Sequence, residues 1–342
     1  MSARIAVVGA GLIGRRHISA LRLAEGVTLA AVVDPDPAAQ DTAPDVPHFQ
    51  TLDAMLAAGV ADGVILATPN RLHKGGGLAC IAAGLPVLVE KPLADTLADA
   101  RALVEASEAA SVALAVGHHR RHNPLIAKAK ALIDEGALGR IAAVQGAAIL
   151  RKPEDYFDLQ WRREKGAGPI LVNLIHDVDL LAHLCGPIEA VQCLASDAIR
   201  GFANEDTAAI SLRFASGALG TVSLSDTAVG PWSWELTARE NPAYPASPGS
   251  CYRIAGTEAA LSLPDLTLWR HEGVPGWWNP LSATRFPVEH GDPLVRQADQ
   301  FGRVITGAEV PLVTGRDGLA AMAVIDAVMR AAESGRTETV TA

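Results

Sequence analysis

Short apolar runs alternate with helix-like segments from residue 4 to about residue 118. The apolar runs are "RIAVVG", "VTLAAVVD", "DGVILAT", "PVLVE" and "VALAVG", and helices are predicted over residues 12–25, 71–83 and 95–110. Parallel strands need long crossover connections and are buried on both faces, so their sequences are almost continuously apolar. The pattern therefore predicts a doubly wound α/β domain over residues 1–120.

The pattern changes after "HHRRHNP". A helix is predicted at about 124–135, a strand near 141–150 and another helix near 170–185. The segments that follow alternate partly between apolar and polar positions, which is typical of antiparallel strands with one buried face. These segments cover residues 188–197, 206–215, 217–226 and 232–238.

The end of the chain completes a second domain. Residues 237–250 are rich in proline and serine and are predicted as a loop, and helices are predicted near 293–307 and 315–334. We expect an α+β domain over residues 121–342, whose last helices can pack back on the first domain. Two domains also suit the length, because 342 residues exceed what one hydrophobic core usually serves.

Composition places the chain among ordinary globular proteins, with 49% hydrophobic and 20% charged residues. No apolar run approaches the roughly 18 to 20 residues of a membrane span. The first strand pattern begins within three residues of the start, which leaves no room for a cleavable leader. We therefore expect a protein of the cytoplasm that does not associate with a membrane.

A net charge of −9 repels polyanions, so nucleic acid is not expected as a partner. The cysteines show no C-x-x-C spacing and lie mostly in apolar segments. They are expected to be buried, reduced thiols without a functional role. The four are Cys80, Cys185, Cys193 and Cys251.

The segment "VVGAGLIGRRH" places Gly9, Gly11 and Gly14 between the first strand and the first helix. Glycine permits a tight turn there and lets backbone N–H groups approach a pyrophosphate at the positive end of the helix. Glycine-rich turns also arise simply to join a strand to a helix, so this spacing is a weak signal by itself. Asp34 strengthens it, because it ends the next strand 20 residues after Gly14.

Asp34 stands where a carboxylate can hydrogen-bond the hydroxyls of an adenosine ribose. The alternative is that it is only a turn residue before Pro35. A carboxylate at this point would repel the 2′-phosphate of NADP, so NAD is predicted as the cofactor. Arg15 and Arg16 leave NADP open, because a nearby cation can accommodate that phosphate.

The segment "GLPVLVEKPLADT" ends an apolar strand with Glu90, Lys91 and Pro92. Ligands of doubly wound sheets lie outside the carboxyl ends of the strands, so Glu90 and Lys91 are expected to face the cofactor cleft. Pro92 steers Lys91 away from helical backbone, and an ammonium so placed can hold and shuttle the proton of an alcohol that loses hydride. The alternative is a solvated pair that merely marks a loop.

These segments together resemble the Gfo/Idh/MocA oxidoreductases, a family named for glucose-fructose oxidoreductase, inositol dehydrogenase and a rhizopine-catabolism protein. The matching segments follow the family's order from residue 4 to about 307, and "EKP" after "TPN..H" is the most specific part. They are "GAGLIGRRH", "VVD", "ATPNRLH", "VLVEKPLA", "VGHHRRHNP", "GAGPILVNLIHDVDLL" and "QADQFGRVITG".

The resemblance implies an N-terminal Rossmann domain and a C-terminal domain on a large, mostly antiparallel open sheet, which often mediates oligomerisation. It also implies that Lys91 is the active-site lysine. The implied cofactor-binding set comprises Leu12, Ile13, Thr68, Pro69, Asn70, His73, Glu90 and Lys91, together with the three glycines and Asp34. From the residues alone, His73 could equally be a surface residue on the helix after the fourth strand.

The segment "GAGPILVNLIHDVDLLAHLCGP" predicts a helix that begins near Pro169 and ends at Gly186 and Pro187. One apolar stripe at helical spacing contains Leu174, Val178, Leu181 and Cys185. Asn173, His176 and Asp177 project from another side. His176 is therefore a candidate general acid or base and Asn173 a candidate for orienting a substrate hydroxyl, although a helical histidine is more often a satisfied structural residue.

The resemblance supports His176, because the family carries a histidine at this place, followed three residues later by the aspartate matched here by Asp179. The chain departs from the family four residues before the histidine, where Val172 replaces the usual aspartate. A local shift in register would bring Asn173 into that position. An asparagine there can hydrogen-bond but cannot act as a base.

The segment "RKPEDYFDLQWRR" offers Tyr156, Trp161, Arg162 and Arg163 on the connection before this helix. An aromatic face with polar groups suits a carbohydrate ring, and arginine suits a carboxylate. The alternative is a packed loop with a solvated charged end. The tryptophans of "WSW" and "PGWW" are expected in a sheet or an interface rather than against a cofactor.

The cluster "HHRRHNP" raises the question of a metal site at His118, His119 and His122. Neighbouring arginines disfavour a bound cation, and no thiolate or paired carboxylate accompanies the histidines, so no metal is predicted. Arg121 is predicted instead to contact the substrate or the edge of the cofactor.

The main hypothesis is an NAD-dependent dehydrogenase that oxidises a secondary hydroxyl of a sugar, cyclitol or related polyol, assembled as a homodimer or homotetramer. Lys91 and His176 would share proton transfer, and the predicted substrate contacts are Arg121, Tyr156, Trp161, Arg162, Asn173 and His176. One alternative is a glycoside-cleaving enzyme that uses NAD without net redox. Another is a dinucleotide-binding regulator without chemistry, which the departure at Val172 motivates.

Overall fold

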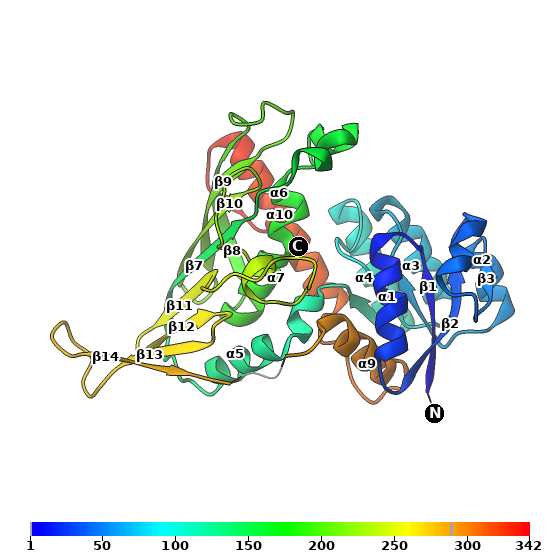
Figure 1. Ribbon diagram of the computed structural model, residues 1–342, viewed down its shortest axis with the longest axis horizontal. Helices are drawn as coiled ribbons and strands as arrows, with labels where there is room; N and C mark the ends of the chain where they lie inside the picture. Colours follow the sequence, from blue (N-terminus) through cyan, green and yellow to red (C-terminus); the bar gives the residue numbers. More distant parts are fainter. Residues whose placement is uncertain (1, 288–289) are drawn as a thin grey trace. The chain divides into compact units, whose positions relative to one another are not determined.

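Two compact units make up the computed structural model, which describes residues 2–287 and 290–342 (Figure 1). The first unit comprises residues 2–123, 291–322 and 342. The second comprises residues 124–287, 290 and 323–341.

Within the described residues, the first unit contains a six-stranded parallel sheet in the order β3-β2-β1-β4-β5-β6. The strands are β1 (Ala3–Val8), β2 (Val27–Val33), β3 (His48–Phe49), β4 (Gly63–Leu66), β5 (Val87–Val89) and β6 (Leu114–Val116). The order of strands reverses between β1 and β4, and ligands of such sheets bind at that reversal. The doubly wound α/β prediction is confirmed.

Helices cover this sheet, and most of them were predicted from the sequence. They are α1 (Leu12–Leu23), α2 (Leu52–Ala58), α3 (His73–Ala82), α4 (Leu97–Ala110), α9 (Pro293–Ile305) and the start of α10 (Gly315–Ser334), with short 3₁₀ turns η1 (Pro37–Thr42), η2 (Asn70–Leu72) and η3 (His119–His122). Ile5, Val7 and Leu88 of the sheet share one buried core with Phe301 and Val304 of α9. Helix α9 is thus part of the first unit because its apolar face completes that core.

The pair β3–α2 has no counterpart in the sequence prediction. Strand β3 has only two residues, His48 and Phe49, which is too short to show a period. Helix α2 is one of the shorter helices, and it begins where the Thr51 hydroxyl accepts a hydrogen bond from the Ala54 N–H at 3.2 Å. The Asp34 N–H donates to the Phe49 carbonyl at 3.0 Å, so β3 lies next to the predicted cofactor residue Asp34.

Over the residues that the structure describes, the second unit contains a nine-stranded sheet in the order β14-β13-β12-β11-β7-β10-β9-β8-β15. All neighbouring pairs are antiparallel except β7 and β10. The strands are β7 (Ile141–Ile149), β8 (Ile188–Ser196), β9 (Thr207–Phe214), β10 (Leu219–Ser225), β11 (Tyr252–Gly256), β12 (Ala259–Leu263), β13 (Thr267–His271), β14 (Leu281–Arg285) and β15 (Glu338–Thr339). The prediction of a large, mostly antiparallel sheet is confirmed.

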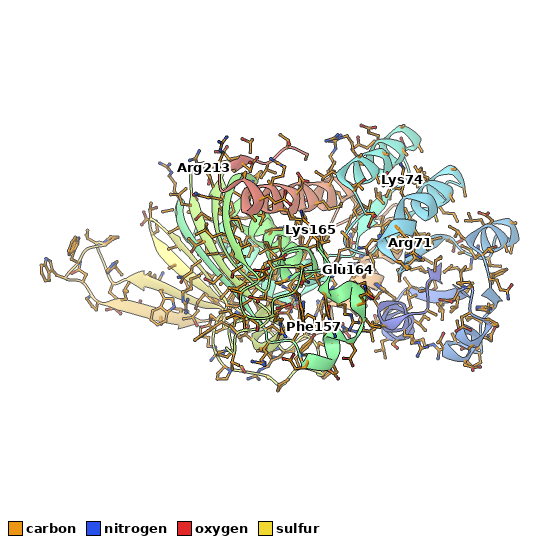
Figure 2. All side chains as sticks on the ribbon, turned by 90° about the horizontal axis from the view of Figure 1, so that it is seen from above. Arg71, Lys74, Phe157, Glu164, Lys165 and Arg213 are labelled. Atoms are coloured by element: carbon orange, nitrogen blue, oxygen red, sulfur yellow. The ribbon has the colours of Figure 1, made fainter. Side chains whose placement is uncertain are left out.

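Helices α6 (Pro169–Val172) and α7 (Leu174–Cys185) lie on one face of this sheet (Figure 1), and α5 (Pro124–Asp134) packs against α7. Strand β9 alternates accordingly, since Ile210 and Leu212 are buried while Ser211 and Arg213 are exposed. Arg213, labelled in Figure 2, marks the exposed face. That face carries a hollow of about 460 Å³ lined by Gln145, Leu219, Thr221 and their neighbours on β7, β10 and β11.

The prediction of a strand over residues 232–238 is wrong, because residues Trp234–Thr237 form the short helix α8. The Ser233 hydroxyl accepts a hydrogen bond from the Leu236 N–H at 3.3 Å and caps this turn. Trp234 is buried and its ring stacks on that of Tyr252, with centroids 5.8 Å apart. The packing of one tryptophan therefore overrides the apolar alternation, which would suit a strand equally well.

All four cysteines are buried, and none forms a disulfide within the described chain, which confirms the prediction of buried, reduced thiols. Burial raises the pKa of Cys80 and of Cys185 to about 12, so both thiols stay protonated near neutral pH. No helix among the described residues is both long and apolar enough to cross a membrane.

Candidate active site

The glycine loop between β1 and α1 depends on close approach of backbone to backbone. Gly9 has a φ of +94°, and a Cβ on it would lie 2.6 Å from the carbonyl oxygen of Ala67. A Cβ on Gly14 would collide with the carbonyl oxygen of Gly9. These two glycines are therefore required by the packing of the loop on β4 and α1.

Among the described residues, no side chain caps the start of α1. Gly11 is the N-cap and supplies no side-chain hydrogen bond, and the first turn carries no acidic residue in the described helix. Leu12 and Ile13 form this first turn, with Leu12 almost fully exposed. The free N–H groups and the positive end of the helix dipole fit a pyrophosphate.

Asp34 follows β2 and ties the glycine loop to the next turn. Its Oδ2 accepts a hydrogen bond from the Ala10 N–H at 2.8 Å, and its Oδ1 accepts one from the Asp36 N–H at 2.9 Å. The residue thus belongs to a turn, as the alternative reading held, and it also faces the cavity described next. The two roles coexist because a carboxylate can accept several hydrogen bonds.

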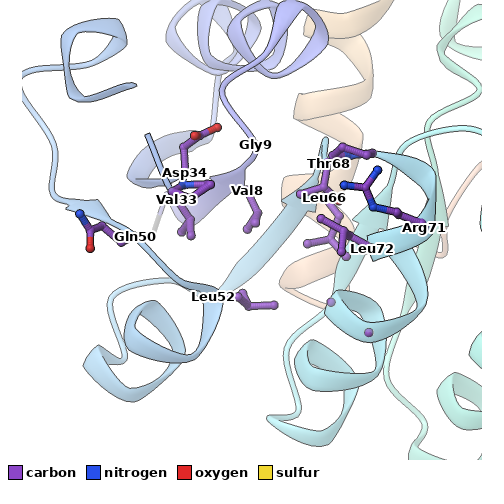
Figure 3. Close-up of a pocket in the computed structure, with 14 residues that line it drawn as sticks. Val8, Gly9, Val33, Asp34, Gln50, Leu52, Leu66, Thr68, Arg71 and Leu72 are labelled. Carbon is purple, nitrogen blue, oxygen red and sulfur yellow. The ribbon is translucent and has the colours of Figure 1, made fainter. Parts of the chain in front are cut away.

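A cavity of about 600 Å³ opens at the carboxyl ends of β1, β2 and β4 (Figure 3). Four predicted cofactor residues line it, namely Gly9, Asp34, Thr68 and Pro69. The volume lies within the range of small-molecule sites, and a mostly apolar wall with one carboxylate fits the adenosine half of a dinucleotide. The residues present therefore fit NAD at this edge of the sheet.

Several lining residues were not predicted, namely Gln50, Leu52, Arg71, Leu72, Gly75 and Gly76. Gln50 follows the two-residue strand β3 and Leu52 begins the short helix α2, neither of which was predicted from the sequence. Arg71 and Leu72 stand inside "ATPNRLH", so this motif itself could have identified them. Asn70, which begins η2, is not among the residues that line the cavity.

The Lys91 turn follows β5, the strand next to β4. The Glu90 N–H donates to the Leu66 carbonyl at 2.9 Å, which continues the ladder to the end of the strand, and the Lys91–Pro92 peptide is cis. Glu90 is only 5% exposed, so the reading of Glu90 and Lys91 as a solvated pair is wrong for the glutamate. Lys91 itself is half-buried.

The Glu90 carboxylate is ionised inside the protein. Burial raises its pKa, but the hydrogen bond from His17 and the positive charge of Lys91 contribute to lowering it to about 2. His17, on α1, is 1% exposed, and its Nε2 lies 2.8 Å from Glu90 Oε1. His17 was not singled out in the sequence, although it stands three residues after Gly14 in "GAGLIGRRH", on the helix turn that follows the glycines.

His73 is fully buried, so its reading as a surface residue is wrong. Its Nδ1 lies 2.9 Å from the carbonyl oxygen of Pro92, and its Nε2 lies 2.8 Å from that of Thr68. The ring therefore bridges the ends of β4 and β5, where two predicted cofactor segments meet. His73 is not among the residues that line the cavity.

Most of the "HHRRHNP" cluster is buried around η3, and His119 is partly exposed. Burial lowers the pKa of His119 and of His122 to about 3, so both rings are neutral near neutral pH. Arg121 is 6% exposed and pairs with Asp317 at 3.2 Å. In the part of the chain that the structure describes, no three or more histidine, cysteine or acidic side chains are grouped as a metal would require.

In the second unit, the helix predicted near 170–185 is divided at Asn173 into α6 and α7. The His176 N–H donates to the Asn173 carbonyl at 3.1 Å, which is a tightened i→i+3 turn. Residues three apart eclipse one another in such a turn. Asn173 rather than Val172 therefore lies one turn before His176.

The polar residues around this junction differ in their surroundings. Among the described residues, the buried Oδ1 of Asn173 has no hydrogen-bond partner. His176 is 8% exposed, Asp179 is 1% exposed, and the Asp177 carboxylate accepts a hydrogen bond from the Tyr252 hydroxyl. Asp177 is thus a structural residue of the second unit, while Asn173 keeps an acceptor unused.

The connection between β7 and α6 gathers the predicted aromatic and basic residues. The Arg162 guanidinium lies 4.1 Å from the ring centre of Tyr156 and 5.4 Å from that of Trp161, and it donates to the Tyr156 carbonyl at 2.7 Å. Phe157, labelled in Figure 2, packs edge-on against Tyr156 at 5.0 Å. Trp161 remains 53% exposed, so this cluster is packed on one side and open on the other.

Sequence comparison assigns both halves of the chain to models of one family. Residues 3–118 match the model described as "Oxidoreductase family, NAD-binding Rossmann fold", and residues 126–262 match the "GFO/IDH/MocA C-terminal domain". The chain is 31% identical to 1,5-anhydro-D-fructose reductase of Ensifer adhaerens, covering 80% of this chain and 78% of the reductase. It is 28% identical to D-apiose dehydrogenase of Paraburkholderia graminis, covering 97% of this chain and 88% of that enzyme.

A solved structure is similar over the whole chain. It is the WlbA dehydrogenase of Bordetella pertussis in complex with NADH and UDP-GlcNAcA, with a TM-score of 0.78 and 27% identity over 100% of both chains. The similarity extends from the glycine loop through the second sheet. A protein of this fold has therefore been solved with bound NADH.

Proposed function

The chain belongs to the Gfo/Idh/MocA oxidoreductases, and we propose that it is an NAD-dependent dehydrogenase acting on a secondary hydroxyl of a sugar, cyclitol or related polyol. One observation carries this proposal. The cavity that fits the adenosine half of a dinucleotide and the Lys91 turn lie at the carboxyl edge of one sheet, the cavity at the ends of β1, β2 and β4 and the turn after β5, the strand next to β4. A dehydrogenase needs a cofactor and a proton-handling group on the same edge.

The chemistry needs two transfers from the alcohol. When bound, NAD⁺ accepts the hydride from the carbon that carries the hydroxyl. The hydroxyl proton must leave at the same time, and we assign its handling to Lys91 and His176. An ammonium of Lys91 hydrogen-bonded to the alcohol oxygen stabilises the negative charge that develops there, while a neutral imidazole can accept the proton.

Asn173 would orient the substrate. The tightened turn supports this role, because it puts Asn173 one turn before His176, where the family usually has aspartate. The unused Oδ1 acceptor among the described residues suits a donor hydroxyl of a polyol. As a neutral group, Asn173 can fix a hydroxyl but cannot increase the basicity of His176 as a carboxylate would.

Substrate contacts are also assigned to Tyr156, Trp161, Arg162 and Arg121. The exposed face of Trp161 beside Arg162 supports a role in binding a sugar ring. Arg121 already pairs with Asp317, so its contact with substrate or cofactor stays a prediction.

Asp34 favours NAD over NADP. Its carboxylate lines the cavity and would face a 2′-phosphate with like charge. Arg15, one of the two nearby cations that left NADP open, donates from its Nε to the Ala10 carbonyl at 3.0 Å. That bond directs Arg15 toward the glycine loop.

The experiment measures NADH formation by the purified protein with NAD⁺ and a panel of inositols, aldoses including D-apiose, uronates and sugar lactones. 1,5-Anhydro-D-fructose is tested in the reductive direction with NADH. Lys91→Ala should lower kcat by about 10²- to 10⁴-fold while NAD⁺ still binds. Parallel assays with NADP⁺ test the assignment to Asp34.

Three outcomes count against this proposal. Full activity of Lys91→Ala removes the lysine from the mechanism. Consumption of a glycoside with no net NADH favours glycosidic cleavage through a transient oxidation. Binding of NAD⁺ without turnover of any member of the panel favours a regulator.

We also propose a homo-oligomer, located in the cytoplasm. The β13–β14 hairpin extends from the edge of the sheet in the second unit (Figure 1), and its tip exposes Trp277 by 95% and Trp278 by 94%. Two indoles present roughly 300 to 500 Å² of apolar surface, a large part of the roughly 800 Å² that each partner buries in a stable interface. A hollow on the exposed face of the same sheet gives a second copy further surface to cover.

Replacing both indoles, Trp277→Ser with Trp278→Ser, should shift the mass in light scattering toward the monomer on dilution. Val229→Ser removes another side chain of the second unit that is 82% exposed, and it should leave the mass unchanged. A wild-type protein that is monomeric at every concentration would contradict the proposed homo-oligomer.

A further inference from the structure

The backbone of the Lys91 turn is held on both sides by buried polar groups. The Lys91 N–H donates to Glu90 Oε2 at 3.0 Å, and His73 Nδ1 lies 2.9 Å from the carbonyl oxygen of Pro92. Both partners are nine-tenths or more buried. The position of Lys91 therefore depends on where the Glu90 carboxylate and the His73 ring are held.

The Glu90 carboxylate is in turn held by His17 of α1. Glu90 Oε1 lies 2.8 Å from His17 Nε2, and Glu90 Oε2 bonds the Lys91 backbone. An ionised carboxylate only accepts hydrogen bonds, so the proton of His17 is on Nε2. A buried charge-assisted bond of this kind is short and strongly oriented, and it fixes the rotation of the carboxyl group.

The Glu90 carboxylate is closely packed and has little room to rotate. A Cβ on Gly117, the residue after β6, would lie 2.8 Å from the Glu90 carboxyl carbon. Gly117 is also bonded through its N–H to the Val89 carbonyl at 2.8 Å. The carboxylate is thus enclosed by the backbone after β6 on one side and by α1 on another.

We propose that His17 is a positioning residue, which orients the Glu90 carboxylate so that its second oxygen holds the backbone of Lys91 for catalysis. This inference rests on the proposed function, because it assumes that Lys91 acts on the substrate. It links α1, the helix that begins at the dinucleotide loop, to the reacting group after β5. The buried His17–Glu90 pair would then fix the position of Lys91 relative to a dinucleotide bound at the start of α1.

The test compares two substitutions of the histidine. His17→Leu removes the donor, whereas His17→Gln keeps an N–H near the position of Nε2. A displacement of a reacting group by about 1 Å costs on the order of 10²-fold in rate, so His17→Leu should lower kcat by about 10- to 100-fold. Its KM for NAD⁺ should stay within about twofold, because the cofactor loop is untouched, and His17→Gln should recover most of kcat.

Glu90→Gln tests the same hydrogen bonds by changing Glu90 instead of His17. His17 Nε2 and the Lys91 N–H bond different oxygens of Glu90, and a side-chain amide replaces one of these oxygens with an NH2 group that donates, so it cannot accept at both positions. It should therefore lower kcat to a similar extent. Should His17→Leu not fold, the comparison of Glu90→Gln with His17→Gln decides the inference.

Asp62→Asn is the matched control. Asp62 accepts hydrogen bonds from the backbone and the guanidinium of Arg4 at 2.7 to 3.1 Å, and it directly precedes β4, at the opposite end of the strand from Thr68. This variant should lose thermal stability without losing kcat. Equal kcat in His17→Leu and wild type, or in Glu90→Gln and wild type, overturns the inference.

Lys91→Ala distinguishes a failure of the proposed function from a failure of the proposed role of His17. If it retains wild-type turnover, the proposed function fails and this inference fails with it. If only Lys91→Ala loses turnover while both His17→Leu and Glu90→Gln keep theirs, the proposed function stands and this inference alone is overturned.

Discussion

Lys91 and His176 are assigned the same kind of work, but their backbones are held in different ways. Lys91 stands in a turn after a buried parallel strand, with Glu90, His17 and His73 bonded around it. His176 stands on α7 just after a division in the helix, where the nearby Asn173 Oδ1 has no bonding partner in the described structure.

This difference predicts how substitutions near each residue should act. Hydrogen bonds already made in the protein hold the Lys91 turn whether or not substrate is present, so its geometry is preorganised. The Asn173 Oδ1 acceptor before His176 has no donor among the described residues, so a hydroxyl of the substrate can supply one and help to order this part of the helix. Changes near Lys91 should therefore act on kcat and on stability, and changes near His176 should act more on substrate binding.

The largest expected effect is that of His176→Gln. Loss of the general base should lower kcat by about 10²- to 10⁴-fold, as measured by NADH formation with the preferred substrate. His183→Gln, two helix turns later on α7, is the matched control and should keep its activity. If His176→Gln is as active as His183→Gln, then His176 is not the general base and Lys91 alone handles the proton.

The stability of the Lys91 turn should depend on pH. Glu90 has a pKa lowered to about 2, below its ordinary value of 4.5. Its contribution is therefore fully present above about pH 4.5 and falls as the pH drops through about 2, with a size on the order of 3 kcal/mol. The gap in unfolding free energy between wild type and Glu90→Gln should shrink between about pH 6 and about pH 3 in urea titrations.

A constant gap over this range would show that the Glu90 carboxylate is not selectively stabilised by folding. His176→Gln is the comparison variant for this experiment. Its gap to wild type should not follow the titration of Glu90.

The smallest expected effect is that of Asn173→Leu. It removes the unused acceptor and should raise KM for the polyol by roughly 2- to 10-fold, the value of one hydrogen bond, with a smaller change in kcat. Asn173→Asp, which restores the family's usual carboxylate one position later, should retain or improve kcat through its effect on His176. If Asn173→Leu changes kcat alone, the contrast between the preorganised lysine and the substrate-ordered histidine is wrong.

The sequence by itself determined the architecture and much of the cofactor side. Continuous apolar runs separated by helical segments specify parallel strands, because such strands are buried on both faces. Gly9, Gly14 and Asp34 are identifiable from spacing, since only glycine permits the close backbone approach that the loop requires. The end of β5 located Glu90 and Lys91, because strand ends of a doubly wound sheet share one edge.

Only the tertiary structure decided the contacts that join distant segments. The pairing of His17 with Glu90 spans 73 residues, and the bridge of His73 to Pro92 depends on how α3 is set against β5. The helix at Trp234 replaced a predicted strand because stacking on Tyr252 outweighs a local alternation that both structures tolerate. The tightened turn at Asn173 is likewise absent from the pattern, since helical periodicity does not distinguish i→i+3 from i→i+4 hydrogen bonding over one turn.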